Sequence, residues 1–158
     1  MSDQVKQIAV TLLKTAKNCA RQNFEKDGHL TPVLLVSQNN KVSVFACVFN
    51  NDEEKDRFGE FLGHLRKTCD AYVLVTEAWM SICEKDKKWD GTRPSKDPNR
   101  KEAIVLTSFW QPNNTDMTMA FIERDWQGTP TLGEWQEKEF SGVSGRFLKS
   151  QQEENELN

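Results

Sequence analysis

The chain has 158 residues, of which 37% are apolar and 28% charged, and its formal net charge is −3. This length fits one domain and is enough to bury roughly 68–70% of the surface that the unfolded chain exposes. The composition excludes a collagen-like, coiled-coil or wholly disordered protein. Because no apolar run approaches ~18 residues, it also excludes a membrane-spanning helix.

The N-terminus and the cysteines indicate a compartment. Lys6, Lys14 and Lys17 interrupt the first apolar stretch, so we expect no signal peptide. The four cysteines form no C-x-x-C pair and no Cys/His cluster at zinc spacing. We therefore expect the thiols to be reduced and the protein to be cytoplasmic. We expect neither a cofactor nor a contact with a membrane.

The first half of the chain predicts one helix and two strands. Apolar residues at three- and four-residue steps predict an amphipathic helix over residues 2–26, with Cys19 on its buried face and Gly28 ending it. Residues 31–38 and 41–49 then predict two strands joined by an Asn39-Asn40 turn. Since the second strand is apolar on both faces, it is expected to be an interior strand, covered on both sides.

The second half predicts another helix and three strands. Asn51 with Glu54 approximates a capping box at the helix start, and an apolar stripe continues to Cys69. Strands are expected over residues 71–80, 102–110 and 117–126, followed by an irregular arm over 127–149 and a disordered acidic tail over 150–158. Residues 1–149 are thus expected to form one α+β domain. It would hold a mostly antiparallel five-stranded sheet with both helices on one face. The element order, α-β-β-α-β-β-β, resembles that of roadblock and profilin-like domains, which implies no function.

A long connection joins the third and fourth expected strands. Residues 81–101 carry seven basic and four acidic side chains, while ordinary hairpin loops have about 2–5 residues. Trp89 lies near its middle, and Arg93, Asp97 and Arg100 follow. An exposed Trp among cations could fill a pocket of a partner or stack on a nucleobase, or the segment could be a solvated loop whose Trp folds back onto the sheet. Nucleic acid is the weaker expectation, because the net charge is negative and one loop makes few phosphate contacts.

Strand alternation predicts a group of carboxylates. If Trp79 pairs with Glu102 and Trp110 with Met117, four acidic side chains gather at one end of one face: Glu77, Glu102, Glu123 and Asp125. Such a group could bind a divalent metal or divide acid and base roles. The alternative is a set of exposed carboxylates paired with Arg100, Lys101 or Arg124. A register slip of one residue would disperse the group.

Three short segments carry a family resemblance. Residues 76–80 read Thr-Glu-Ala-Trp-Met, residues 97–102 read Asp-Pro-Asn-Arg-Lys-Glu, and residues 132–135 read Leu-Gly-Glu-Trp. Together they resemble a group of small uncharacterised bacterial and phage proteins, and the resemblance implies no activity. It draws attention to the sheet end that alternation also indicates.

No nucleotide-binding, hydrolase or metalloprotease motif is present in the sequence. The leading hypothesis is a non-enzymatic cytoplasmic binding or assembly module. Its surface for a protein or small ligand would lie at the sheet end and the 81–101 loop, with Trp79, Trp89, Arg93, Asp97 and Arg100 as binding residues. It would act through an unknown protein partner or self-association at a sheet edge or helix face. The alternative is a metal-dependent enzyme that acts on a phosphate-containing substrate through Glu77 and Glu102, and the third is a weak nucleic-acid binder.

Overall fold

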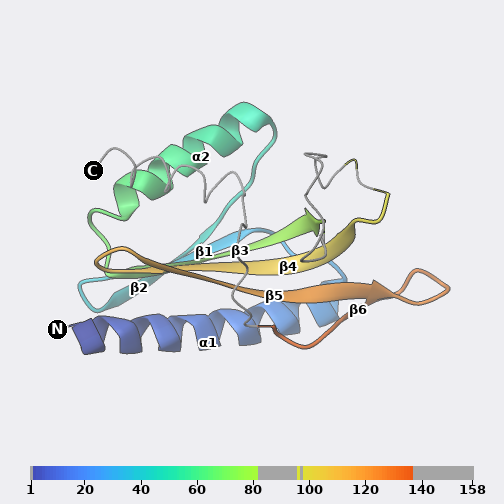
Figure 1. Ribbon diagram of the computed structural model, residues 1–158, viewed down its shortest axis with the longest axis horizontal. Helices are drawn as coiled ribbons and strands as arrows, with labels where there is room; N and C mark the ends of the chain where they lie inside the picture. The colour runs from blue at the N-terminus through green and yellow to red at the C-terminus, as the bar shows by residue number, and fades with distance from the viewer. Residues whose placement is uncertain (1, 82–95, 97, 137–158) are drawn as a thin grey trace, which may run out of the picture.

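The computed structural model describes residues 2–81, 96 and 98–136 of the chain (Figure 1). It is an α+β fold, as predicted. In chain order the elements are α1 (Ser2–Asp27), β1 (Val33–Gln38), β2 (Lys41–Ala46), α2 (Asp52–Leu65), β3 (Ala71–Met80), β4 (Lys101–Trp110), β5 (Asn114–Arg124) and β6 (Pro130–Leu132). Among these residues, no helix is long and apolar enough to cross a membrane.

The strands form one antiparallel sheet in the order β2-β1-β3-β4-β5-β6. The expectation of five strands is wrong, because β6 adds a sixth and extends the element order. It comes from the segment that was expected to be an irregular arm, and it pairs with the end of β5, Ile122 opposite Leu132. The Pro and Gly residues around it mark the ends of a three-residue edge strand, where proline is tolerated.

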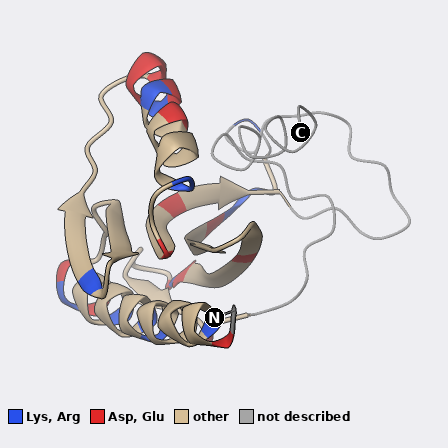
Figure 2. Cartoon of the chain, turned by 90° about the vertical axis from the view of Figure 1, so that its left-hand side faces the viewer, with Lys and Arg blue, Asp and Glu red and all other residues tan. Residues whose placement is uncertain are grey.

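The two helices cover opposite faces of the sheet, so the prediction that both lie on one face is wrong (Figure 1). The apolar face of α1 packs with Val73, Val75 and Leu106. Residues of the other parity, including Leu74 and Phe109, pack with Leu62 of α2. Since the central strands are apolar on both faces, each face needs its own helix. Figure 2 shows the sheet curving between the helices, whose outer positions carry many charges.

The position of β2 in the sheet differs most clearly from the prediction. It was expected to be an interior strand, yet it lies at the edge of the sheet and every one of its residues is exposed. The strand has the composition of a covered strand, but α1 packs on the inner strands and α2 packs over β1 and β3.

Local signals placed the turns and caps correctly. Asn39 and Asn40 both have positive φ, at 52° and 63°, which suits a two-residue hairpin that follows the twist of the strands. Gly28, with φ of 74°, ends α1 and donates its N–H to the carbonyl of Phe24. The Oδ1 of Asn51 accepts the N–H of Glu54 at 2.8 Å, as the capping box predicted. Cys19 is exposed rather than buried, because the buried stripe of α1 runs through its neighbours Ala16 and Ala20.

Arg21 connects α1 to the segment after β5, a contact that the helical periodicity did not indicate. Its guanidinium donates to the carbonyls of Leu132 and Gly133 at 3.1 and 2.7 Å. The same group lies 5.5 Å from the centre of the Trp135 ring. A planar guanidinium can make these contacts at once, and we infer that it holds β6 against the helix.

Replacing Arg21 by methionine should therefore loosen β6. Methionine keeps an unbranched stem but loses two charge-assisted hydrogen bonds, so we expect a loss of about 1.5–3 kcal/mol in the free energy of unfolding. Hydrogen exchange should also become faster at the N–H of Gly133, which donates to Phe121. The control is Arg57→Met, because Arg57 makes an exposed i,i+4 pair with Glu53 and should contribute less than about 1 kcal/mol. Equal effects of both substitutions would contradict the role of Arg21.

Candidate functional site

One end of the sheet brings together the C-terminal end of β3, the start of β4 and the end of β5. Trp79 pairs with Glu102, which is the register that the sequence analysis assumed. The guanidinium of Arg100 lies 4.3 Å from the centre of the Trp79 ring, within the range of a cation–π contact. Trp79 is nonetheless 44% exposed. This sheet end therefore presents a half-exposed aromatic ring with a cation on it.

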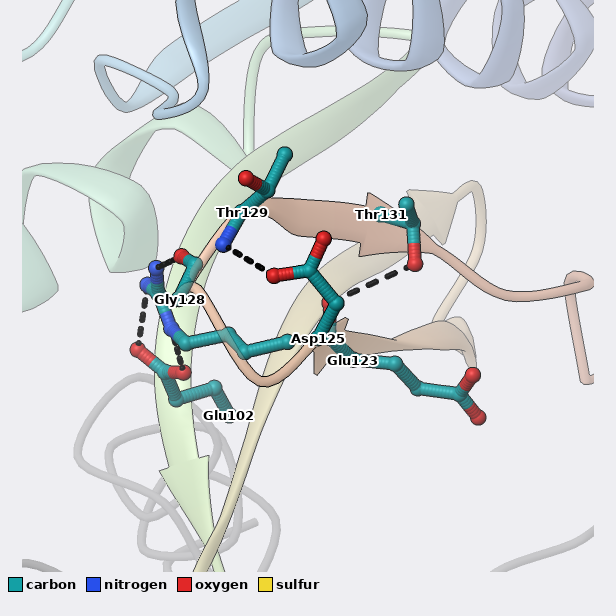
Figure 3. A network of polar contacts seen from close by, with 7 residues as sticks. Glu102, Glu123, Asp125, Gly128, Thr129 and Thr131 are labelled. Atoms are coloured by element: carbon teal, nitrogen blue, oxygen red, sulfur yellow. Dashed lines mark hydrogen bonds and ion pairs between the residues drawn. The ribbon is translucent and has the colours of Figure 1, made fainter.

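Glu102, the strand partner of Trp79, forms a two-point ion pair with Arg124, drawn as dashed lines in Figure 3. The Nε of Arg124 lies 2.7 Å from Oε2 of Glu102, and its Nη2 lies 3.0 Å from Oε1. The hydrogen bond from Arg124 lowers the pKa of Glu102, and the charges of Arg124 and Arg100 act in the same direction. Since both carboxylate oxygens are engaged and the group stays ionised, Glu102 is poorly suited to donate a proton at neutral pH.

Glu77 lies on the same face as Glu102, two residues before Trp79 on β3. Its Oε1 accepts the backbone N–H of Leu30 at 2.5 Å. Leu30 belongs to the connection between α1 and β1. Glu77 therefore binds the segment that leads from the helix into the sheet.

The predicted four-carboxylate group does not form. Trp110 pairs with Asn114 rather than Met117, because the turn is only three residues long and the side chain of Asn114 closes it on the carbonyls of Trp110 and Gln111. This shift of three residues is odd, so it moves Glu123 to the opposite face. Figure 3 shows its carboxylate pointing away from Glu102. Phe121 moves with it and packs with Val105 and Met119.

Asp125 stabilises the turn that follows β5. Its Oδ1 accepts the N–H groups of Gln127 and Thr129, both at 2.9 Å. The carbonyl of Gly128 accepts a hydrogen bond from Arg124 at 3.3 Å. Within residues 2–81 and 98–136, no three His, Cys, Asp or Glu side chains lie where they could hold a metal ion. The metal hypothesis based on Glu77, Glu102, Glu123 and Asp125 therefore loses the clustering that it required.

The same turn presents a residue that the sequence reasoning missed. Trp126, expected to end a strand, is 91% exposed. The sequence does carry a signal for a turn at this point. Asp125 and Gly128 are the residue types favoured at the first and last positions of a common β-turn. Two tryptophans, Trp79 and Trp126, are thus exposed at this sheet end. Trp89, Arg93 and Asp97, predicted to bind here, lie outside the described residues.

The Glu102–Arg124 pair predicts a small, pH-dependent contribution to stability. Because the pKa of Glu102 is lowered in the folded state, the contribution is present above the pKa of the unfolded chain and is lost as the pH falls through the folded value. With Arg124 partly exposed, Glu102→Gln should cost less than about 1 kcal/mol at pH 7. Urea unfolding at several pH values should show wild type and variant converging in acid. A difference that persists unchanged at pH 2 would contradict the pairing.

Comparison with known proteins identifies the family. Residues 1–143 match the family model described as bacteriophage lambda protein ea47. No curated protein and no solved structure gives a significant match. The match confirms the resemblance to a group of phage proteins. The matched range includes β3, β4 and β5, whose ends form the sheet end. Since the match spans most of its length, the chain belongs to the family of bacteriophage lambda protein ea47.

Proposed function

We propose that this chain is a non-enzymatic binding or assembly module and that the sheet end binds a protein partner. The observation that carries the proposal is the exposure of Trp79 and Trp126 at one end of the sheet, with Arg100 and Arg124 between them in the register. Trp and Arg are the residue types most enriched among those that dominate binding energy in protein interfaces. The expected compartment remains the cytoplasm.

The surroundings of the two rings favour a protein over a small ligand. Trp79 is held by Arg100, and Arg124 is held by Glu102 and the turn that carries Trp126. The Trp79 ring and the backbone of the turn that carries Trp126 are therefore held in place, which reduces the entropy lost when a partner binds. A small-molecule site would need a concave pocket with converging polar groups, whereas Trp126 projects from a turn.

The enzyme alternative receives less support from the geometry. Glu102 is bound by Arg124, and Glu77 by the N–H of Leu30. The pKa of Glu102 is lowered, whereas a general acid at neutral pH requires a raised one. The nucleic-acid alternative depends on residues of the 81–101 loop that lie largely outside the described part.

Binding can be tested with the full chain immobilised as bait in a bacterial cell extract. Proteins retained by the wild type are compared with those retained by Trp79→Ala/Trp126→Ala and by the control Val10→Ala, an exposed apolar residue of α1. A retained protein is then purified and its dissociation constant measured by calorimetry. Because interface tryptophans typically contribute 2 kcal/mol or more, we expect the double variant to bind at least about 30-fold more weakly.

Two results would contradict this proposal. The first is a partner that binds the double variant as tightly as the wild type, because it would place the binding surface elsewhere. The second is an increase of the melting temperature with Mg²⁺ or Mn²⁺ that Glu77→Gln abolishes, because a bound metal stabilises the folded state by mass action. That second result would favour the enzyme alternative.

A further inference from the structure

Strand β2 is an exposed apolar edge. It lies at the opposite side of the sheet from β6, and among the described strands its one neighbour is β1. Val42, Val44 and Phe45 are 59%, 65% and 50% exposed, and Val48 just after the strand is 70% exposed. Natural proteins protect such edges with charges, proline or a covering segment. Within β2 the single charge is Lys41, at its first position.

The backbone of β2 offers a regular row of hydrogen-bonding groups. The two-residue turn makes Gln38 and Lys41 a hydrogen-bonded pair, and the N–H of Cys47 donates to the carbonyl of Pro32 at 2.8 Å. Alternation therefore turns the N–H and C=O groups of Val42, Val44 and Ala46 away from β1. Within the described part of the chain, these groups face no further strand.

We propose that a second copy of this chain pairs along β2. The two β2 strands run antiparallel about a two-fold axis that is perpendicular to the sheet and passes between the two Val44 residues. Val44 then lies opposite Val44 of the second copy, and Val42 opposite Ala46. Each pair exchanges both backbone hydrogen bonds, so the outward groups of the edge are satisfied. The result is one sheet that continues through both copies.

The side chains of β2 are complementary to themselves in this register. On the α1 side of the sheet, where Val44 pairs with Leu35 of β1, the new cross-strand pairs are valine with valine and valine with alanine. On the α2 side, the small Ser43 lies opposite Phe45 of the second copy. The two Phe45 rings are diagonal neighbours, close enough for aromatic side chains to touch.

Charge favours a second copy in the antiparallel direction. Two-fold symmetry places the Lys41 residues at opposite ends of the paired strands, roughly 20 Å apart at about 3.4 Å per residue. A parallel alignment would bring the two ammonium groups together, and like charges directly opposite each other destabilise a sheet.

The exposed apolar area beside β2 is close to the minimum for a specific contact. An open apolar hollow of about 410 Å³ lies beside β2, lined by Phe45, Val48, Phe58 and Phe61 among others. Val42, Val44, Phe45, Val48 and the 47% exposed Phe61 present on the order of 500 Å² per copy, taking roughly 150–200 Å² for each fully exposed side chain. Complete covering of this surface on two copies would exclude at most about 1,000 Å², which is the lower limit for a specific interface.

Position 44 provides the test, because the proposed axis brings it next to itself. Sedimentation velocity of the wild-type chain should give twice the mass of the 18.2 kDa monomer. Val44→Lys and Val44→Glu, each alone, should sediment as monomers, because two like charges would meet at the axis. An equimolar mixture of the two variants should recover the dimer, since opposite charges then pair. Val10→Lys, on exposed α1 surface away from the edge, should remain dimeric.

Each other outcome overturns the inference. A wild type that stays monomeric at high concentration excludes the dimer, and a dimer that persists in both Val44 variants places the interface elsewhere. If the mixture stays monomeric, Val44 does not lie opposite Val44 of the second copy. If the chain forms open-ended aggregates, the contact is not a two-fold dimer. Trp79 lies on β3, which β1 separates from β2, and Trp126 follows β5, so neither residue belongs to this edge. The proposed function of the sheet end can therefore be wrong while the dimer is right, and the dimer can be wrong while that function is right.

Discussion

Phe109→Ala should destabilise the protein by about 3–5 kcal/mol, the range measured when a fully buried aromatic side chain is truncated in a core. Phe109 is 0% exposed and stacks on Tyr72, with ring centres 5.2 Å apart. Both rings belong to the cluster under α2, with Leu74 and Leu62. Truncation leaves a cavity on the one face of the sheet that α2 covers, and a rigid sheet cannot close it. Urea unfolding followed by circular dichroism measures the loss.

Phe61 supplies the matched control for this substitution. It is also a phenylalanine, but it lies on α2 and is 47% exposed. Phe61→Ala should therefore change the free energy of unfolding by much less than Phe109→Ala. If both alanine variants lost the same stability, Phe109 would not be the centre of the α2-side core. Loss of dimer in Phe61→Ala with unchanged monomer stability would agree with the proposed contact along β2.

Periodicity predicted the helices and the first five strands because each carries its own local signal. Each of these signals involves residues that are close in sequence. Examples are the apolar spacing of α1, the Asn39-Asn40 turn and the Asn51 cap. The face that each helix covers depends on contacts far apart in sequence. Val73 and Leu74 are adjacent on β3 and both are buried, one toward α1 and the other toward α2. Two buried residues in succession indicate two covered faces, which could have excluded the one-sided arrangement.

The register assumed from the sequence was right for one hairpin and wrong for the next, for a geometric reason. The β3–β4 register, with Trp79 opposite Glu102, follows from matching the apolar faces of two long strands. The β4–β5 register depends on the length of the turn, and Asn114 begins β5 three residues earlier than expected. Since side chains alternate, this single difference sends Glu123 to the other face. A carboxylate group predicted from alternation is thus only as certain as the turn that sets the register.

The interior-like sequence of β2 is informative because the isolated chain does not explain it. Sequence patterns report the environment that a strand occupies when it functions, including any partner. Val42, Val44 and Phe45 would gain cross-strand neighbours on both faces of the sheet if a second β2 lay beside them. The disagreement between an interior pattern and an edge position therefore supports the proposed dimer. The prediction of a covered strand was wrong for the single chain.

Alkaline pH should destabilise the protein through Cys69. Burial raises the pKa of this thiol from 9.0 to about 11, and the nearby charge of Asp70 acts in the same direction. Between these values the unfolded chain loses the proton while the folded chain keeps it, so the free energy of unfolding falls as the pH rises. The contribution is complete below about pH 8 and decreases through pH 11. Two pKa units correspond to about 2–3 kcal/mol.

Cys69→Ala isolates this effect, because other groups titrate equally in both proteins. Urea unfolding at intervals from pH 8 to pH 11 should give a steeper decline for the wild type than for the variant. Parallel declines would show that Cys69 ionises as easily when folded as when unfolded. Burial also raises the pKa of Cys47, which acts in the same direction. At neutral pH a thiol reagent should modify the exposed Cys19 of the folded protein before Cys69, because the thiolate is the reactive form and burial opposes it.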